Sequence, residues 1–250
     1  MCNMVAMPAK RIVILLYLHK IQLLMKALIA NIKISINEKS YLIDPFSTKL
    51  GKNIVCHSID MIEELGFEKF TFKKLGEKID SPEASIYRYF KNKNQLLSYL
   101  ISWYWGWMEY RLVFETANVA SARVRLERAI ALIGSGIGDV KVHDGMDMRK
   151  LNQIVIAESS KSYLTKEVDR ANKEGAFYNY KQFVLRVVDI VKENNTSYKY
   201  PNMLVSTVIE GAHLQFFFAE HLPRLTNKQK SKNYITEFYT ALVLNSINGK

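Results

Sequence analysis

The stretch of sequence that decides the fold lies within residues 48–100. Its centre reads Gly66-Phe67-Glu68-Lys69-Phe70-Thr71-Phe72-Lys73-Lys74-Leu75 and, after five residues, Ser81-Pro82-Glu83-Ala84-Ser85-Ile86-Tyr87-Arg88-Tyr89-Phe90-Lys91-Asn92-Lys93. Apolar residues recur at helical spacing, and turn-forming residues separate the apolar segments. The pattern predicts three short helices and a longer fourth, an arrangement that suits a helix-turn-helix.

Capping residues indicate where these helices begin and end. A first helix over 48–65 should end at Gly66, because glycine adopts a left-handed backbone without steric cost. Thr71 is the expected N-cap of a second helix over 72–79. Ser81 is expected to cap the third helix, whose first turn can accept a proline.

The rest of the chain is dominated by helical periodicity. Asn92 should cap a long fourth helix over 95–117. Further helices are expected at 121–135, 146–160, 165–194, 201–221 and 227–247. Loosely alternating isoleucines within 30–44 form the only strand-like stretch. The sequence therefore predicts an all-α protein: an N-terminal arm (1–47), a three-helix helix-turn-helix DNA-binding domain (48–94) and a helical-bundle effector-binding and dimerisation domain (95–250).

The composition suits a folded protein with an anionic partner. Of 250 residues, 48% are hydrophobic, and the formal net charge is +11, which favours nucleic acid or an acidic membrane surface. Residues 48–94 nevertheless hold nine Lys/Arg and seven acidic residues, a net of only +2. DNA binding is thus inferred from the residue pattern, not from basicity. Two cysteines, Cys2 and Cys56, are too few for a disulfide framework and fit a reduced, cytoplasmic compartment.

The first residues of the chain admit two interpretations. The apolar run at 12–18 follows Lys10-Arg11, but it is short for a signal peptide and far too short to span a bilayer. We interpret residues 1–24 as sequence upstream of the true start. The alternative is a basic amphipathic arm that touches membrane or DNA; otherwise, no stable membrane association is expected.

The third helix is the expected reading element on double-stranded DNA, because a short helix can enter the major groove. The residues expected near base edges are Glu83, Ala84, Ser85, Arg88 and Tyr89. Tyr87, Lys91 and Lys93 are better suited to phosphate oxygens, which fix the register without reading sequence. Leu75, Ile79 and Ile86 should pack between the second and third helices.

The motif Thr71-Phe-Lys-Lys-Leu-Gly, with Ser85-Ile-Tyr-Arg-Tyr-Phe-Lys-Asn-Lys and Leu96-Leu97, resembles the TetR/AcrR family of bacterial transcriptional regulators. The resemblance covers about a fifth of the chain. It implies phosphate contacts by Tyr87 and Lys93, base contacts by the start of the third helix, and a position facing the DNA backbone for Thr71. Together with the residues above, the expected DNA contacts are Thr71, Lys73, Glu83, Ala84, Ser85, Tyr87, Arg88, Tyr89 and Lys93. Two departures bear on the turn: Asp80-Ser81-Pro82 replaces the usual Gly-Val-Ser, and Gly76 replaces a common alanine.

The resemblance also implies a homodimer that binds a palindromic operator through a four-helix interface. Two apolar stripes could supply this interface: Leu204, Val208, Ala212 and Phe216, and Tyr234, Phe238, Ala241 and Leu242. The family further implies a pocket for a small apolar or aromatic effector. Candidate lining residues are Trp103, Trp107, Tyr110 and Tyr178, although aromatic rings at single positions more often fill a core.

Other motifs are weaker. Glu210-x-x-His213 has metal-ligand spacing, but di-iron bundles need two such pairs. The glycines at 134–138 lack the lysine of a phosphate loop. Neither a metal, a cofactor nor an enzymatic activity is therefore expected. The main hypothesis is a dimeric, effector-released repressor; the alternatives are a helical ligand- or lipid-binding protein or enzyme whose first helices are only structural, and a membrane-surface protein.

Overall fold

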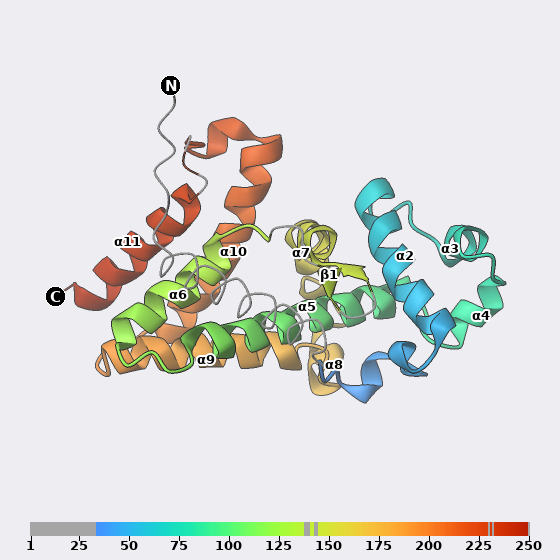
Figure 1. Ribbon diagram of the computed structural model, residues 1–250, viewed down its shortest axis with the longest axis horizontal. Coiled ribbons are helices and arrows are strands. Elements are labelled where there is room, and N and C mark those ends of the chain that lie inside the picture. Colours follow the sequence, from blue (N-terminus) through green and yellow to red (C-terminus); the bar gives the residue numbers. More distant parts are fainter. Residues whose placement is uncertain (1–33, 138–140, 143–144, 230, 232, 250) are drawn as a thin grey trace, which may run out of the picture.

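The computed structural model describes residues 34–137, 141–142, 145–229, 231 and 233–249 (Figure 1). It is an elongated assembly of helices in which α5 (Lys93–Thr116) joins two parts. Helices α2, α3 and α4 lie together at one end, and α6, α9, α10 and α11 form a helical body towards the other. The all-α prediction is confirmed.

The first part consists of α2 (Lys49–Leu65), α3 (Phe72–Lys78) and α4 (Glu83–Tyr87). The side-chain oxygen of Thr48 accepts a hydrogen bond from the amide of Gly51, and that of Thr71 accepts one from the amide of Lys74. Gly66 follows α2 with a φ of 78°. These three predicted helix boundaries are confirmed.

The predicted cap of the third helix is wrong. Helix α4 begins at Glu83, the N-cap position is Pro82, and no side chain caps the helix. The amide of Ser81 instead donates to the carbonyl oxygen of Gly76 at 2.9 Å. Ser81 therefore belongs to the turn that leaves α3.

The helical body comprises α6 (Ala122–Gly134), α7 (Met148–Tyr163), α8 (Val168–Lys173), α9 (Tyr178–Asn194), α10 (Pro201–His221) and α11 (Tyr234–Asn248). Asn92 caps α5 as predicted, because its side chain accepts from the amide of Gln95. The single helix expected over 165–194 is wrong: it is divided into α8 and α9 near Gly175, which has a φ of 85°. The last helix also starts later than the expected residue 227.

The strand-like reading of 30–44 is wrong for the residues that the structure describes. The 3-10 turn η1 (Glu38–Ser40) lies in this stretch instead, and a second one, η2 (Pro45–Ser47), directly follows the stretch. The strands are β1 (Lys141–Val142) and β2 (Met146–Asp147), which pair antiparallel. Residues 1–33, including the proposed upstream segment 1–24 and the start of the arm, lie outside the described residues.

Helix α5 forms the centre of the core. Its buried residues lie all round the helix and include Leu96, Trp103, Trp107 and Leu112. A helix that is apolar on every side is one that neighbours surround. Helices α6, α7 and α9 pack against it, so that both parts of the molecule share one continuous core.

Candidate nucleic-acid interface and interhelical chamber

The turn between α3 and α4 brings the backbone of Gly76 unusually close to that of Ser81. A Cβ atom added to Gly76 would lie 2.6 Å from the carbonyl oxygen of Ser81, a distance that real Cβ contacts do not show. Asp80 adopts a left-handed backbone with a φ of 50°, as short polar residues can. The two departures from the family pattern thus belong together: Asp80 takes the conformation of the missing turn glycine, and Gly76 leaves space for the turn.

The small core beneath this turn is as predicted. Leu75 and Ile86 are fully buried, Ile62 and Phe67 are buried with them, and Ile79 packs against their edge. This packing fixes α4 against α2 and α3.

The outer surface of α3 and α4 carries most of the predicted DNA contacts. Thr71, Lys73, Ala84, Tyr87 and Arg88 are exposed, while Glu83 and Ser85 are half-buried. The ring of Tyr87, with 47% of the residue exposed, packs edge-on against the ring of Phe72 at a centroid distance of 5.1 Å. This contact ties the last residue of α4 to the first residue of α3, so that their exposed side chains keep a fixed relation.

The prediction that Tyr89 contacts base edges is wrong. Tyr89 is only 6% exposed, and its hydroxyl lies 2.7 Å from the hydroxyl of Thr48, with which it shares a hydrogen bond. The physical reason is the length of α4: the helix ends at Tyr87. Tyr89 consequently follows the turn inward and ties it to the start of α2.

Lys93 has a place inside the protein that the sequence did not indicate. Its Nζ donates to the carbonyl oxygens of Phe67, Glu68 and Phe70 at 3.0, 3.0 and 3.3 Å, and it lies 4.7 Å from the centroid of the Phe67 ring. An ammonium group has three N–H donors. The phosphate contact expected of Lys93 therefore competes with three hydrogen bonds that hold the α2–α3 turn to the start of α5.

Helix α7 connects the helix-turn-helix part with the body. Lys150 Nζ lies 2.6 Å from Asp60 Oδ1 on α2, and Lys161 Nζ lies 3.3 Å from Glu68 Oε1. The hydrogen bond to Asp60 raises the pKa of Lys150, which favours the charged form. A displacement of α7 would therefore pull on α2 through the Lys150–Asp60 ion pair.

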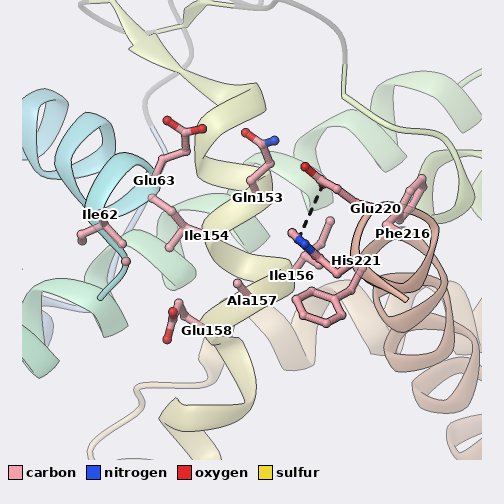
Figure 2. Close-up of a pocket in the computed structure, with 12 residues that line it drawn as sticks. Ile62, Glu63, Gln153, Ile154, Ile156, Ala157, Glu158, Phe216, Glu220 and His221 are labelled. Carbon is pink, nitrogen blue, oxygen red and sulfur yellow. Dashed lines mark ion pairs between the residues drawn. The ribbon is translucent and has the colours of Figure 1, made fainter. Parts of the chain in front are cut away.

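A cleft of about 240 Å³ lies at this junction, between α2, α7 and α10, and Figure 2 shows residues that line it. Ile62 and Glu63 approach it from α2, Gln153 and Ile154 from α7, and His221 from the end of α10. Helix α7 is thus not packed solidly on both sides.

A second site lies inside the body, where four helices meet. Glu210 of α10 accepts hydrogen bonds from the hydroxyls of Tyr163 on α7, at 2.8 Å, and Tyr180 on α9, at 3.1 Å. Trp105 of α5 lies against the Tyr180 ring at a centroid distance of 4.5 Å. These residues and Phe177 line a cavity of about 10 Å³, which we call the Glu210 chamber. A cavity of this volume holds at most about one water molecule, so the chamber has no room for an organic ligand in this state.

The Glu210–His213 pair does not form a metal site here. His213 is buried, its Nδ1 has no hydrogen-bond partner, and burial lowers its pKa to about 4. Glu210 is engaged by the two tyrosines. Over the part of the chain that the structure describes, no group of three or more His, Cys, Asp or Glu side chains could hold a metal ion.

The four aromatic residues predicted to line an effector pocket are not brought together. Trp103 and Trp107 are buried, Tyr110 is half-buried and Tyr178 is exposed. Trp103 and Tyr178 share an open hollow of about 970 Å³, outside the Glu210 chamber. The sequence analysis missed Glu210 and Tyr163 as chamber residues. A signal was present, because Glu210 is a carboxylate within the apolar run of α10.

The apolar stripe proposed for the dimer face of α10 is wrong. Leu204, Val208 and Ala212 are buried within the protomer, because this face of α10 packs against α9 and α6. The stripe on α11 differs: Phe238 and Leu242 are exposed.

Comparison with known proteins agrees with this arrangement. The family model "Bacterial regulatory proteins, tetR family" matches residues 57–100, which include all of α3 and α4. Among curated proteins, none matches the sequence significantly. No helix within the described residues is both long and apolar enough to cross a membrane.

Solved structures share the fold at low sequence identity. Superantigen PfiT has a TM-score of 0.54 and 16% identity, covering 83% of this chain and 100% of its own. The fatty acid degradation regulator FadR from Bacillus halodurans has a TM-score of 0.53 and 12% identity, covering 79% and 98%. AibR, solved with isovaleryl coenzyme A and operator DNA, has a TM-score of 0.50 and 15% identity, covering 80% and 97%. The family match assigns a TetR-type helix-turn-helix to residues 57–100, and the solved structures show that the chain shares their fold.

Proposed function

We propose that this protein is a cytoplasmic repressor that binds a palindromic operator as a homodimer and leaves it when a small-molecule effector binds. The observation that carries the proposal is the exposed surface of α3 and α4, which is fixed from beneath by a buried core. Because the turn, the Tyr87–Phe72 contact and the Tyr89–Thr48 hydrogen bond all constrain α4, the reading surface is preorganised.

On DNA, we assign base-edge contacts to the start of α4 and to the exposed Arg88. Glu83, Ala84 and Ser85 lie at the start of this helix, and the major groove, about 12 Å wide, admits a helix in this way. Thr71, Lys73 and Tyr87 are assigned to phosphates, because they flank α4 on the same exposed surface. Lys93 is assigned mainly a positioning role, since its ammonium group already holds three carbonyl oxygens.

For the dimer, support comes from apolar side chains left exposed on the last two long helices. Met203 and Leu214 on α10 are 67% and 51% exposed, and Phe238 and Leu242 on α11 are 58% and 36% exposed. Contiguous exposed apolar surface is typical of interaction sites. Two copies joined there would present two α4 helices to half-sites about 34 Å apart on one face of the DNA.

For effector release, support comes from the position of α7. This helix contributes Tyr163 to the Glu210 chamber and Lys150 to the ion pair with Asp60 on α2. An effector that opens the chamber would displace α7 and shift the population towards dimers whose α4 helices no longer match the half-site spacing. It can do so only by as much as its affinity for the two states differs.

The experiment is binding of the purified protein to its own promoter region and to random DNA, measured over a series of salt concentrations. We expect tighter binding to the promoter, with log affinity falling linearly as log salt rises. Lys73→Ala should weaken both interactions, whereas Lys192→Ala, an exposed lysine on α9, is the matched control and should change neither. Equal affinity for random DNA, or no dependence on salt, would contradict the proposal.

A further inference from the structure

Among the residues that the structure describes, the carboxylate of Glu210 has no cationic partner. Its hydrogen-bond donors are two tyrosine hydroxyls, and none of the ion pairs among the described residues includes it. Buried carboxylates are costly unless paired. Glu210 is half-buried. The chain has a net charge of +11, yet none of the described basic side chains forms an ion pair with this carboxylate.

The groups around Glu210 leave its negative charge uncompensated. Burial raises the pKa of Tyr163 and of Tyr180 above the usual tyrosine value, so both hydroxyls stay protonated and neutral. His213, one turn further along α10, is also uncharged at neutral pH, because burial lowers its pKa to about 4. The chamber therefore carries a single negative charge among neutral walls.

Aromatic rings make up much of those walls. Trp105, Tyr163, Phe177 and Tyr180 line the chamber together with Glu210. Ring faces attract cations through their quadrupole, most strongly where water is excluded. The combination of a carboxylate and aromatic walls favours a positively charged ligand with an apolar body over a neutral or anionic one.

One wall of the chamber is held by few contacts. Ala176 and Phe177 end the segment 164–177, which we call the lid segment, and its helix α8 contains no buried residue. Three side-chain hydrogen bonds fasten the segment: Ser102 Oγ donates to the carbonyl oxygen of Ala176 at 3.0 Å, Asn37 donates to that of Glu174 at 2.9 Å, and Lys181 Nζ donates to Asn172 Oδ1. Segments with little buried surface open at low cost, so the closed chamber can enlarge at this side.

We propose that the effector is an organic cation, bound with its charged nitrogen at Glu210 and its apolar body against Trp105 and Tyr180 under the lid segment. The inference rests on the proposed function and names the chemical class of its effector. Glu210 has acceptor sites beyond the two that the tyrosines use, so an ammonium N–H can bind without displacing either hydroxyl. The lid segment follows Tyr163, the last residue of α7, so its opening pulls on the end of that helix.

The test uses three probes of matched size: phenylbutylammonium, phenylbutanol and phenylbutyrate, titrated calorimetrically into the DNA-free protein. We expect the cation to bind at least about tenfold more tightly than the alcohol, and the anion to bind most weakly. Glu210→Gln, which keeps shape and hydrogen bonding, should abolish the preference. Glu220→Gln on the same helix removes an exposed carboxylate outside the chamber and should preserve it.

Equal binding of the three probes, failure of the cation to bind, or a preference that survives Glu210→Gln overturns the proposal. If Glu210→Gln does not fold, Tyr163→Phe serves as the second variant: it keeps the charge of Glu210 and must keep the preference for the cation. The comparison of the three probes on the wild-type protein still decides whether the chamber selects a cation. Promoter binding is measured separately without probe. Charge-selective binding without release from DNA contradicts the release mechanism alone, whereas promoter binding without charge selectivity contradicts the effector class alone.

Discussion

Gly76 and Ser81 face each other across the turn of the helix-turn-helix with no space for a side chain between them. A methyl group on Gly76 would lie 2.6 Å from the carbonyl oxygen of Ser81 and 3.3 Å from the amide nitrogen of Glu83. Both neighbours are backbone atoms and cannot rotate away. The angle between α3 and α4 therefore depends on the absence of one carbon atom.

Gly76→Ala should destabilise the protein and weaken promoter binding. Alanine favours a helix by about 1 kcal/mol over glycine, but overpacking against backbone typically costs about 1–3 kcal/mol, so we expect a net loss. Thermal melting and promoter titration measure both effects. Gly136→Ala is the matched control, because nothing lies within 4 Å of an added Cβ there; an unchanged melting temperature for Gly76→Ala would show that the turn relaxes.

Lys93→Ala should lower the melting temperature and weaken binding to all DNA sequences alike. The ammonium group holds three carbonyl oxygens of the α2–α3 turn, and hydrogen bonds to charged groups contribute about 1.5–3 kcal/mol each, less where water screens them, as at this half-buried side chain. Lys91→Ala, at an exposed neighbouring position, should leave the melting temperature unchanged. Loss of DNA affinity at constant stability would instead make Lys93 a phosphate contact.

Tyr89→Phe should cost stability without altering which DNA sequence is preferred. The substitution removes the hydroxyl that shares a hydrogen bond with Thr48, worth about 1 kcal/mol, and keeps the buried ring. Arg88→Ala, at an exposed position, should relax sequence preference with little loss of stability. Selection of bound sequences from randomised operators distinguishes the effects of the two variants. A changed consensus sequence for Tyr89→Phe would show that Tyr89 does contact base edges.

Stability should fall as the pH drops from neutrality towards 4, in part because of His213. Its pKa in the folded protein is about 4, below the ordinary value of 6.5, so between these values the unfolded chain binds the proton and the folded protein does not. The contribution of neutral His213 to the free energy of unfolding is fully present above pH 6.5. About 3 kcal/mol of it is lost as the pH falls to 4. Urea unfolding across this window should show a shallower pH dependence for His213→Gln than for the wild type.

Phe238→Asp should convert the proposed dimer into a monomer that keeps its fold. The side chain is exposed on α11, and a buried charge without a partner strongly opposes association. Sedimentation velocity measures the outcome. Leu185→Asp, at an exposed position on α9, should change nothing, whereas Val208→Ala should lower stability without altering association, because Val208 packs inside the protomer.

The sequence was most informative where structure is local. Thr71 and Asn92 cap helices as predicted, because a cap depends on the next three residues only. The prediction for Ser81 failed because its amide closes the end of α3 by a hydrogen bond to the carbonyl oxygen of Gly76, so that α4 starts two residues later, at Glu83. The prediction for Tyr89 failed because the length of α4 decides which way the Tyr89 side chain faces. No local signal in the sequence fixes where so short a helix ends.

The Glu210 chamber was beyond prediction for a different reason. Its residues come from α5, α7, α9 and α10, and from the lid segment between α7 and α9. No spacing in the sequence relates Trp105 to Tyr163 or Glu210, because only the packing of the four helices brings them together. A lone carboxylate in an apolar helix indicates that a partner exists, not which one.

Helix α5 limits how this regulator could be recombined with others. Its first turns complete the DNA-binding part: Lys93 holds the turn after α2, and Tyr99 packs against Phe90 at a centroid distance of 5.3 Å. Further along, the same helix supplies Trp105 to the chamber. A chimaera joined just after Asn94 would separate α2, α3 and α4 from the α5 residues that pack against them. Functional hybrids should therefore require a junction further along α5, so that Tyr99 is transplanted together with the helices it supports.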